Sequence, residues 1–348
     1  MLDERGDAGG ALPESVQGII AARLDLLAVD EKELLQDAAV VGKVFWLGAV
    51  ASLGDGRERW LVEQALHGLE RRELVVRERR SSVAGESEYA FRHVLVRDVA
   101  YGQIPRAARG TKHVAAAGWI EGLSPERAED RAEMLAYHYL SALDLARATG
   151  SSLAAIEDRV RLALRVAGDR SLSLSAFTGA ARHYAAAIEL WPPEDAERPR
   201  LLLDLGRARW HGEESGETEL TGARDAFADA GDVEGEAEAE GLLAQVAWIR
   251  GDNTRVATHL DRIAELVPRL PDGRAKAYVL SYAARLHALG FELERANALG
   301  EEALAIASRL GLKELQAFTL NNLSVASTYG GNLARSVELL EEAASNRP

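Results

Sequence analysis

Apolar positions near the start of the chain follow the 3.6-residue period of amphipathic helices. The first predicted helix opens at Leu12-Pro13-Glu14-Ser15, where proline is tolerated because the first turn offers no partner to an N–H group. The apolar stripe at this spacing comprises Val16, Ile19, Ile20, Arg23, Leu24 and Leu27. The acidic, glycine-rich residues 1–11 before it are predicted to be disordered.

Three more helices are predicted before residue 73. The second begins near Asp30, which is the predicted N-cap with Glu33 three residues later, and it ends at Gly42-Lys43. Its predicted core positions are Leu34, Leu35, Ala38 and Val41. The segment Val44-Phe45-Trp46 leads into a short third helix, and a fourth runs over residues 57–72.

The pattern then changes to strands. Leu74–Arg77 and Tyr89–Arg92 are two strand-like runs, joined by the polar Ser81–Ser87 loop that contains Gly85. Three or four helices followed by a β-hairpin is the order of a winged-helix domain, and we assign residues 12–104 to that fold. An unrelated small α+β domain is the alternative.

The segment Tyr89–Tyr101 changes its period in the middle. Its first residues alternate in polarity as in a half-buried strand, whereas the residues from Val94 onward repeat at helical spacing. His93 lies at the corner between the two. We expect this corner to couple the mixed domain to the helical region that follows.

After Val94 every predicted element is a helix. Helices at 93–103, 106–122 and 125–149, with 105–157 as linking residues, lead into a repeat region over residues 158–348. Small residues recur there in a tetratricopeptide-like pattern, which lets two antiparallel helices approach closely. The landmarks are Leu164, Ala167, Gly168, Ala180, Tyr184, Ala187 and Pro192, then Ala244, Gly251, Val256, Leu260, Ile263 and Pro268, then Ala284, Gly290, Ala296, Gly300 and Ala303, then Ser324, Gly331, Ser336, Leu340, Ala343 and Pro348.

The repeats predict a mainly α protein, in which the winged helix precedes a right-handed α-solenoid of about five hairpins. Val256, Ala296 and Ser336 stand forty residues apart, so the helices should be longer than in the usual repeat of about 34 residues. Residues 198–232 form a second, degenerate unit, and the glycines that should loosen it are Gly206, Gly212 and Gly216. The last unit has no polar capping helix, so it should expose an apolar face. We expect either that the chain dimerises through this face or that it is a fragment.

The amino-acid composition and the net charge argue against several classes of function. The chain is 47% hydrophobic but only 6% aromatic, which favours helices packed through small contacts. It has no cysteine, which removes disulfides and cysteine nucleophiles and is compatible with the cytoplasm, the expected location. No apolar run reaches the roughly 18 residues of a membrane span. The net charge of −14 opposes binding to nucleic acid phosphate.

Six segments carry a family resemblance: residues 12–16, 20–25, 39–46, 70–75, 89–105 and 180–190. Together they resemble the carboxy-terminal part of a bacterial STAND-type signalling ATPase. The branch is the one in which an adenylate/guanylate cyclase domain precedes an AAA-like ATPase and a tetratricopeptide array. The resemblance covers nearly the whole chain, and the first 110 residues carry most of its specificity.

The resemblance implies that the winged helix packs over a nucleotide-binding core and that a histidine reads the phosphates. The helical array would sense a ligand or protein. By its position His93 is that histidine, with Arg92 and Arg97 as further nucleotide-sensing candidates. An imidazole donor near a phosphate would favour the ADP-bound form. The local sequence is Phe-Arg-His, whereas related switch ATPases have Met-His-Asp. The alternative role of His93 is an ordinary hydrogen bond at the strand-to-helix corner.

The chain itself is not expected to catalyse a reaction. A phosphate loop needs G-x-x-x-x-G-K-[ST], but Gly42-Lys43 has Asp37 at the first glycine position and Val44 after it. The paired cyclase aspartates are also missing. We expect ATP or ADP and magnesium only with an upstream ATPase core, in the same or another chain, as partner. The histidines never pair at i, i+4, so no metal site is predicted either.

Two partner hypotheses remain. A protein or peptide is predicted in the groove of the helical array, and the positions expected to face it are Gln245, Trp248, Arg285, Asn321 and Tyr329. The alternative function is a stand-alone winged-helix transcriptional regulator with a tetratricopeptide sensor arm. DNA is the less favoured partner, because the reader helix carries Glu58, Glu63 and Glu70 beside its arginines; the basic wing residues are Arg77, Arg79 and Arg80.

Overall fold

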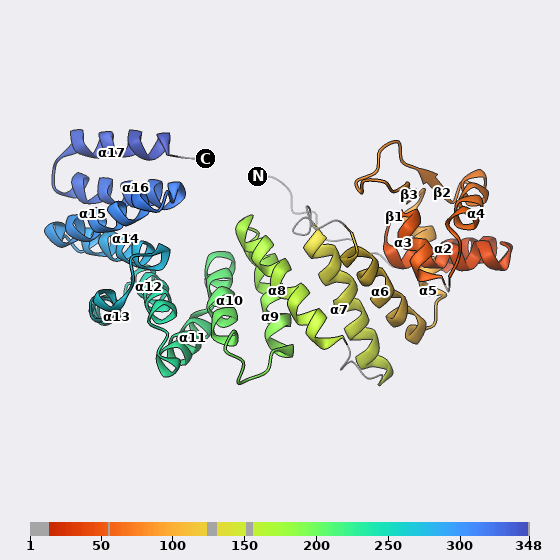
Figure 1. Ribbon diagram of the computed structural model, residues 1–348, viewed down its shortest axis with the longest axis horizontal. Helices are drawn as coiled ribbons and strands as arrows, with labels where there is room; N and C mark the ends of the chain where they lie inside the picture. The colour runs from red at the N-terminus through yellow and green to blue at the C-terminus, as the bar shows by residue number, and fades with distance from the viewer. Residues whose placement is uncertain (1–13, 55, 124–130, 151–155, 347–348) are drawn as a thin grey trace. The chain divides into compact units, whose positions relative to one another are not determined.

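The computed structural model describes residues 14–54, 56–123, 131–150 and 156–346, and this part of the chain is mainly α-helical (Figure 1). It divides into two compact units, residues 1–167 and 168–348. The predictions for residues 1–13, for the start of the 125–149 helix and for Pro348 lie outside the described residues. No described helix has both the length and the apolar character needed to cross a membrane.

The first unit contains a small antiparallel sheet among helices. Its first elements are α1 (Glu14–Asp25), α2 (Val29–Val41), β1 (Val44–Trp46), α3 (Leu47–Leu53), α4 (Arg59–Arg71), β2 (Val75–Arg77), β3 (Glu88–Phe91) and α5 (Val94–Gly102). The strand order is β1-β3-β2. Because β3 is central, Ala90 pairs with Val44 on one side and with Val76 on the other. The predicted β2–β3 hairpin is confirmed.

Strand β1 was not predicted. Phe45 and Trp46 are buried, and the ring of Phe45 lies 5.9 Å from Tyr89 and 5.5 Å from Phe91. A three-residue strand is too short to show an alternation of polarity, so the sequence alone gives no signal for it. Its pairing with β3 and the aromatic contacts decide its conformation.

The start of α2 differs from the prediction. The N-cap is Ala28, and its side chain makes no hydrogen bond. Asp30 lies inside the first turn, where its charge still favours the positive end of the helix dipole, so the predicted capping box is wrong. The predicted core positions of this helix are confirmed, since Leu34, Leu35 and Ala38 are almost fully buried.

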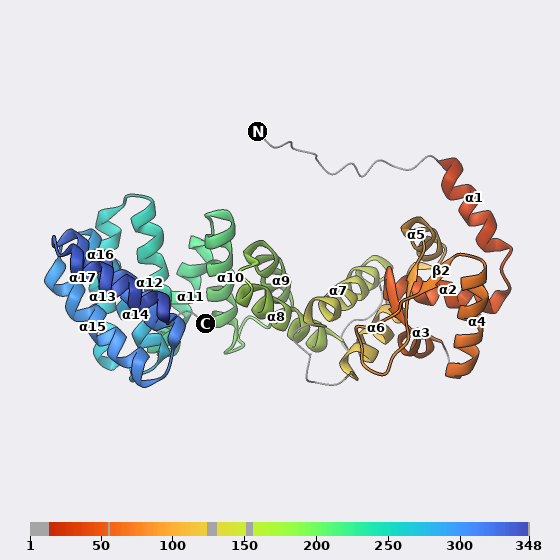
Figure 2. The ribbon, with the colours of Figure 1, turned by 90° about the horizontal axis from the view of Figure 1, so that it is seen from above.

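The apolar stripe of α1 is only partly buried. Leu24 and Leu27 belong to the core, but Val16 and Ile19 are 37% and 64% exposed. The cause is position: α1 lies at the edge of the unit and contacts α5 along one side (Figure 2).

Two further helices share the core of the first unit. α6 (Arg106–Glu121) packs on α2 and α3, and α7 (Ala132–Thr149) packs on α6. Trp119 of α6 stacks on Trp46 of β1 with ring centres 5.6 Å apart. The predicted linking helices are therefore held to the sheet by side-chain packing.

The second unit is an array of helical hairpins. Its elements are α8 (Glu157–Ser173), which crosses the boundary between the units, α9 (Phe177–Leu190), α10 (Arg198–Glu213), α11 (Glu217–Ala230), α12 (Val233–Ile249), α13 (Asn253–Leu266), the 3₁₀ turn Val267–Arg269, α14 (Arg274–Leu289), α15 (Leu293–Arg309), α16 (Lys313–Tyr329) and α17 (Leu333–Ser345). α10 packs on α11, α12 on α13, α14 on α15 and α16 on α17. The described part is a mainly α helical-repeat solenoid.

Glycines let the helices of a hairpin approach closely. A Cβ atom on Gly168 would lie 2.6 Å from Cε1 of Tyr184, and one on Gly206 would lie 2.7 Å from Cγ of Leu220. Gly216 has a φ of 99°, and a Cβ atom there would lie 2.5 Å from the carbonyl oxygen of Gly206. The prediction that such glycines loosen the second hairpin is therefore wrong, because they permit its close packing.

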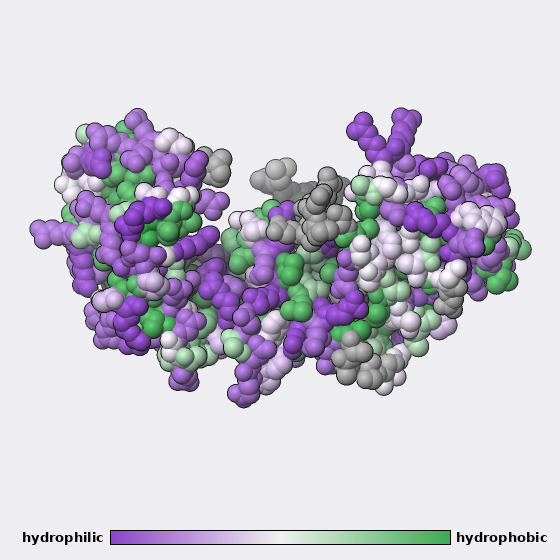
Figure 3. Space-filling view, viewed as in Figure 1, coloured by the Kyte–Doolittle hydropathy of each residue, from purple (hydrophilic) through white to green (hydrophobic). Residues whose placement is uncertain are grey.

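The forty-residue spacing is confirmed as a structural period. Val256, Ala296 and Ser336 occupy buried positions on α13, α15 and α17, and α12, α14 and α16 have 17, 16 and 17 residues. The expected apolar face of the last hairpin is also present, since Leu333 and Val337 are 65% and 54% exposed. Figure 3 shows hydrophobic side chains among hydrophilic ones in the region of α16 and α17.

Candidate functional site

The corner between β3 and α5 leaves Arg92 and His93 in solvent. His93 is the N-cap residue of α5, with extended backbone angles (φ −133°, ψ 132°), and its side chain makes no capping hydrogen bond. Both side chains are exposed, and Arg92 lies 3.8 Å from Glu73. The imidazole is therefore accessible to a partner and is not used to cap the helix.

Arg97, the third predicted sensing residue, has a different environment. Its Nε donates to the carbonyl oxygen of Ala39 at 3.0 Å, and its guanidinium lies 4.9 Å from the ring centre of Tyr101. Arg97 thus holds α5 against α2. Arg97 therefore has a packing role between two helices, whereas Arg92 and His93 both lie at the surface.

Tyr101 begins a buried polar chain that the sequence did not reveal. Its hydroxyl lies 2.9 Å from Nε2 of His113, and Nδ1 of His113 lies 2.9 Å from Nδ1 of His138. Both histidines are fully buried. Burial lowers the pKa of His113 to about 3, helped by His138, and lowers the pKa of His138 to about 4. Both rings are therefore neutral near pH 7, so one Nδ1 donates and the other accepts.

Asp37 is the other buried polar group of this region. Its carboxylate accepts from Nη1 of Arg57 at 2.7 Å and from Nζ of Lys112. Gly42 ends α2, with its N–H group donating to the carbonyl oxygen of Ala38 at 3.1 Å. The Gly42-Lys43 pair is therefore a helix end, and Asp37 is an anchor for α6.

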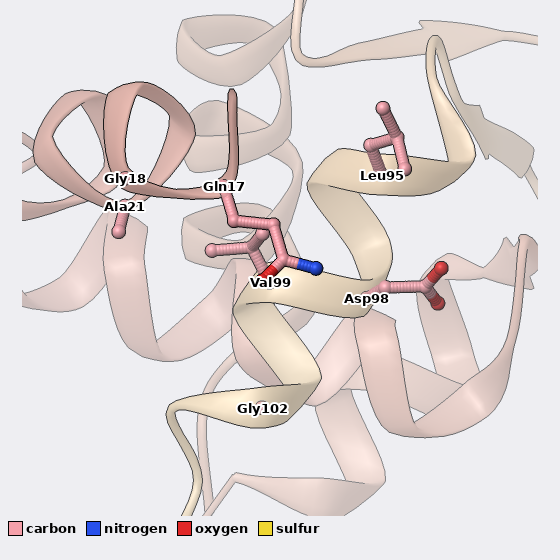
Figure 4. A pocket seen from close by; sticks show the side chains of 7 residues that line it. All are labelled: Gln17, Gly18, Ala21, Leu95, Asp98, Val99 and Gly102. Carbon is pink, nitrogen blue, oxygen red and sulfur yellow. The ribbon is translucent and has the colours of Figure 1, made fainter. Parts of the chain in front are cut away.

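A cleft of about 430 Å³ lies between α1 and α5 (Figure 4). Its lining consists of Gln17, Gly18 and Ala21 on α1 and of Leu95, Asp98, Val99 and Gly102 on α5. The neighbouring Ile19 and Val94 are 64% and 49% exposed. This side of the first unit is a largely apolar surface close to the His93 corner.

The second unit carries a separate candidate surface on the first helices of its hairpins. α10 contacts α12, α12 contacts α14, and α14 contacts α16, in addition to their hairpin partners. Figure 1 shows α12, α14 and α16 following one another along the array. We define the inner face as the face of α10, α12, α14 and α16 that carries, on α14, Arg274, Tyr278, Tyr282 and Arg285. Arg274 and Arg285 are exposed, Tyr278 is half-buried and Tyr282 is buried.

Equivalent positions repeat along the inner face. Gln245 and Arg285 are forty residues apart and occupy the same position on α12 and α14. The Oε1 atom of Gln245 is buried without a hydrogen-bond partner among the described residues, and the side chains of Arg285 and Asn321 are exposed. Three of the five predicted groove residues thus present accessible polar groups or an unused acceptor.

The other two predicted groove residues are partly used in packing. Trp248 packs against the core between α12 and α14. Tyr329 is 46% exposed, and its ring lies 5.2 Å from Phe291. Asn322, beside Asn321, is buried and donates to Ser281 at 3.0 Å, so it does not face a partner.

An aromatic cluster on the inner face was missed. The ring centre of Tyr282 lies 4.7 Å from Tyr278 and 4.9 Å from Phe318. Burial and the neighbouring Tyr282 raise the pKa of Tyr278, so its hydroxyl stays protonated. Glu238, Tyr278 and Phe318 are forty residues apart, and extending that period from the landmark residues would have identified this row.

Charged residues continue the inner face on α10 and α12. Arg207 donates to Glu238 at 3.2 Å, and Arg200 lies 3.1 Å from the same carboxylate. Burial raises the pKa of Asp204, although Arg200 and Arg207 counteract it. These cations and anions neutralise one another within the array.

Two arginines of the predicted reader helix, Arg59 and Arg72, and the wing residue Arg77 already have partners. Arg59 forms a bidentate pair with Glu86 at 3.0 Å, and Arg72 lies 3.5 Å from Glu31. Arg77 donates to the hydroxyl of Ser87 at 3.0 Å. Among the residues that the structure describes, no cluster of His, Cys, Asp and Glu side chains could hold a metal ion.

No family model matches this chain, and no curated protein matches it. The crystal structure of BtubC from P. vanneervenii is similar with 18% identity and a TM-score of 0.45, over 68% of this chain and 91% of that one. Aspartyl phosphate phosphatase F from Bacillus subtilis has 13% identity and a TM-score of 0.44, over 98% and 96%. A signal transduction ATPase with numerous domains (STAND) and a tetratricopeptide repeat sensor, from Pyrococcus horikoshii, has 14% identity and a TM-score of 0.43; the match covers 95% of this chain and 52% of that one.

Proposed function

We propose that the chain is a non-catalytic regulatory region of a STAND-type signalling ATPase, in which residues 158–348 bind a protein or peptide partner. The inner face is the observation that carries this proposal. Aromatic and polar side chains recur there on consecutive helices, at positions forty residues apart. A concave row of repeats is the surface on which solenoid proteins bind extended partners.

The binding part is tested by selecting peptides from a phage-displayed library against the whole chain. Hydrogen exchange of the chain with each enriched synthetic peptide then locates the site. We expect protection in α12, α14 and α16. Protection confined to other elements, or no enriched peptide, would refute the assignment of the inner face.

A nucleotide-sensing role for residues 12–104 is the second part of the proposal. The order α2-α3-α4-β2-β3, with β1 completing the sheet, supports the winged-helix interpretation. The exposed imidazole of His93 supports sensing, because it can donate to a phosphate oxygen presented by an ATPase core with bound ADP and magnesium. In a protein that joins this chain to such a core, His93→Ala should weaken ADP binding, while the control His67→Ala should not. Equal ADP affinity in both variants would contradict the role.

DNA binding is the alternative, and one observation favours it. Arg79 and Arg80 on the wing are exposed, and no ion pair joins either to a carboxylate in the described residues. The test is fluorescence anisotropy with a labelled 20-base-pair duplex at increasing salt. We expect no binding by the wild-type chain; a salt-dependent affinity that Arg79→Ala and Arg80→Ala abolish would replace the first proposal with this one.

A further inference from the structure

A cavity of about 150 Å³ lies inside the helical array, between α13, α14 and α15. Its wall includes Leu260, Leu280 and Ala283, which are buried in the core of the array. The 3₁₀ turn Val267–Arg269 completes one side through Val267 and Pro268. None of these residues belongs to the inner face, so the cavity is a separate candidate site.

The cavity is apolar and has the size of one small ring. Eight of its ten lining residues are apolar. A water molecule in a cavity needs two to four polar partners, so this wall favours an apolar occupant. An apolar cavity of about 150 Å³ holds a molecule of the size of benzene. The lining residues Ala264, Pro268 and Arg295 are exposed and mark the side from which a ligand can enter.

His287 supplies one hydrogen-bond acceptor to this wall. Its side chain is buried, and Nδ1 lies 3.0 Å from a carboxylate oxygen of Glu292. Burial lowers the pKa of His287, helped by Arg295 and counteracted by Glu292, so the ring is neutral near pH 7. Because a carboxylate only accepts, the proton of the neutral ring is on Nδ1, and Nε2 carries a lone pair.

This lone pair is open to a ligand. The described structure gives Nε2 of His287 no hydrogen bond, and Nε2 is not among its fully enclosed polar atoms without a partner. The cavity therefore combines an apolar space for one ring with a single accessible acceptor. A charged ligand is not required, because Arg295 at the mouth already lies 3.9 Å from Glu292.

The geometry points to a small uncharged molecule, with one apolar ring and one hydroxyl group, as the ligand of this cavity. The ring fills the apolar space, and the hydroxyl donates to Nε2 of His287. Such a ligand contacts both the α12–α13 hairpin and the α14–α15 hairpin. This site is independent of peptide binding at the inner face.

Phenol is the probe, and toluene is a molecule of nearly the same shape without a hydrogen-bond donor. Isothermal titration calorimetry of the whole chain measures both affinities, and hydrogen exchange locates the site. We expect phenol to protect α13 and α14. His287→Leu removes the acceptor, so the ratio of phenol affinity to toluene affinity should fall about tenfold, because a buried hydroxyl without a partner is costly. A change in cavity size affects both probes alike.

Ala264→Phe closes the mouth from an exposed position and should abolish binding of both probes. Ala257→Phe is the matched control, since Ala257 is exposed two turns earlier on the same helix and outside the lining. It should leave both affinities unchanged, and circular dichroism checks that each variant is folded. An equal ratio of affinities in wild type and His287→Leu would overturn the inference. The absence of phenol binding, or protection confined to other helices, would overturn it as well.

Discussion

Replacing Gly206 by alanine should destabilise the second hairpin. The new Cβ atom would lie 2.7 Å and 2.8 Å from Cγ and Cδ2 of Leu220 and 3.0 Å from its backbone nitrogen. Leu220 is fully buried, and a backbone nitrogen cannot move aside without moving α11. Overpacking of a core costs about 1–3 kcal/mol, and alanine recovers about 1 kcal/mol over glycine in a helix. Because one contact is to backbone, we expect a net loss of about 1–2 kcal/mol.

Gly222→Ala is the matched control in the same hairpin. Gly222 lies within α11, and a Cβ atom there would have nothing within 4 Å, so the substitution should stabilise by about 0.5–1 kcal/mol. Hydrogen exchange with mass spectrometry on peptides covering α10 and α11 reports both changes locally. Gly206→Ala should exchange faster than wild type and Gly222→Ala more slowly. Slower exchange in Gly206→Ala would refute the close-packing argument and restore the loosening role.

Three further predictions concern buried polar groups. The pKa values of His113 and His138, about 3 and about 4, lie below the unfolded value near 6.5, so the unfolded chain binds more protons in between. The stability of the first unit is complete above about pH 6.5 and falls toward pH 4, by up to about 1.4 kcal/mol per pH unit for each histidine; urea midpoints that are equal at pH 7 and pH 5 would contradict this. Asp37→Ala leaves two cations without their shared carboxylate and should cost about 2 kcal/mol in urea unfolding, whereas an unchanged midpoint would argue against an anchoring role. Tyr184→Phe removes a hydroxyl that donates to Asp169 at 2.7 Å and should cost about 1 kcal/mol; protection of α9 in hydrogen exchange equal to wild type would count against it.

Long periodic segments were predictable, whereas contacts between distant segments were not. The helical period and the small residues at fixed intervals located the hairpins, because both follow from local geometry. β1 escaped because three residues carry no period, and its conformation depends on β3 more than forty residues later. The predicted N-cap at Asp30 is wrong because α2 begins earlier, at Val29. Its N-cap residue, Ala28, has no polar side chain that would mark a helix start in the sequence.

The residues of the candidate surfaces also divide into those that the sequence predicted and those that it did not. Gln245 and Arg285 were predicted as positions on the inner helices, and they occupy the same position on α12 and α14. Tyr278 and Phe318 share another position, but aromatic residues at helical spacing usually belong to a core, and both are half-buried against the core of α14, α15 and α16. The pair His113 and His138 had no sequence signal, since the two residues are on different helices and meet only through the packing of α7 on α6.

The segment Tyr89–Tyr101 remains central to the first unit for a physical reason. Its strand half pairs with both other strands, and its helix half carries Arg97 to α2 and Tyr101 to His113 on α6. The exposed His93 therefore lies between a strand and a helix that are both fixed to the rest of the unit. Substituting Tyr101 by phenylalanine removes the bond to His113 but keeps the ring, so it separates packing from this polar connection.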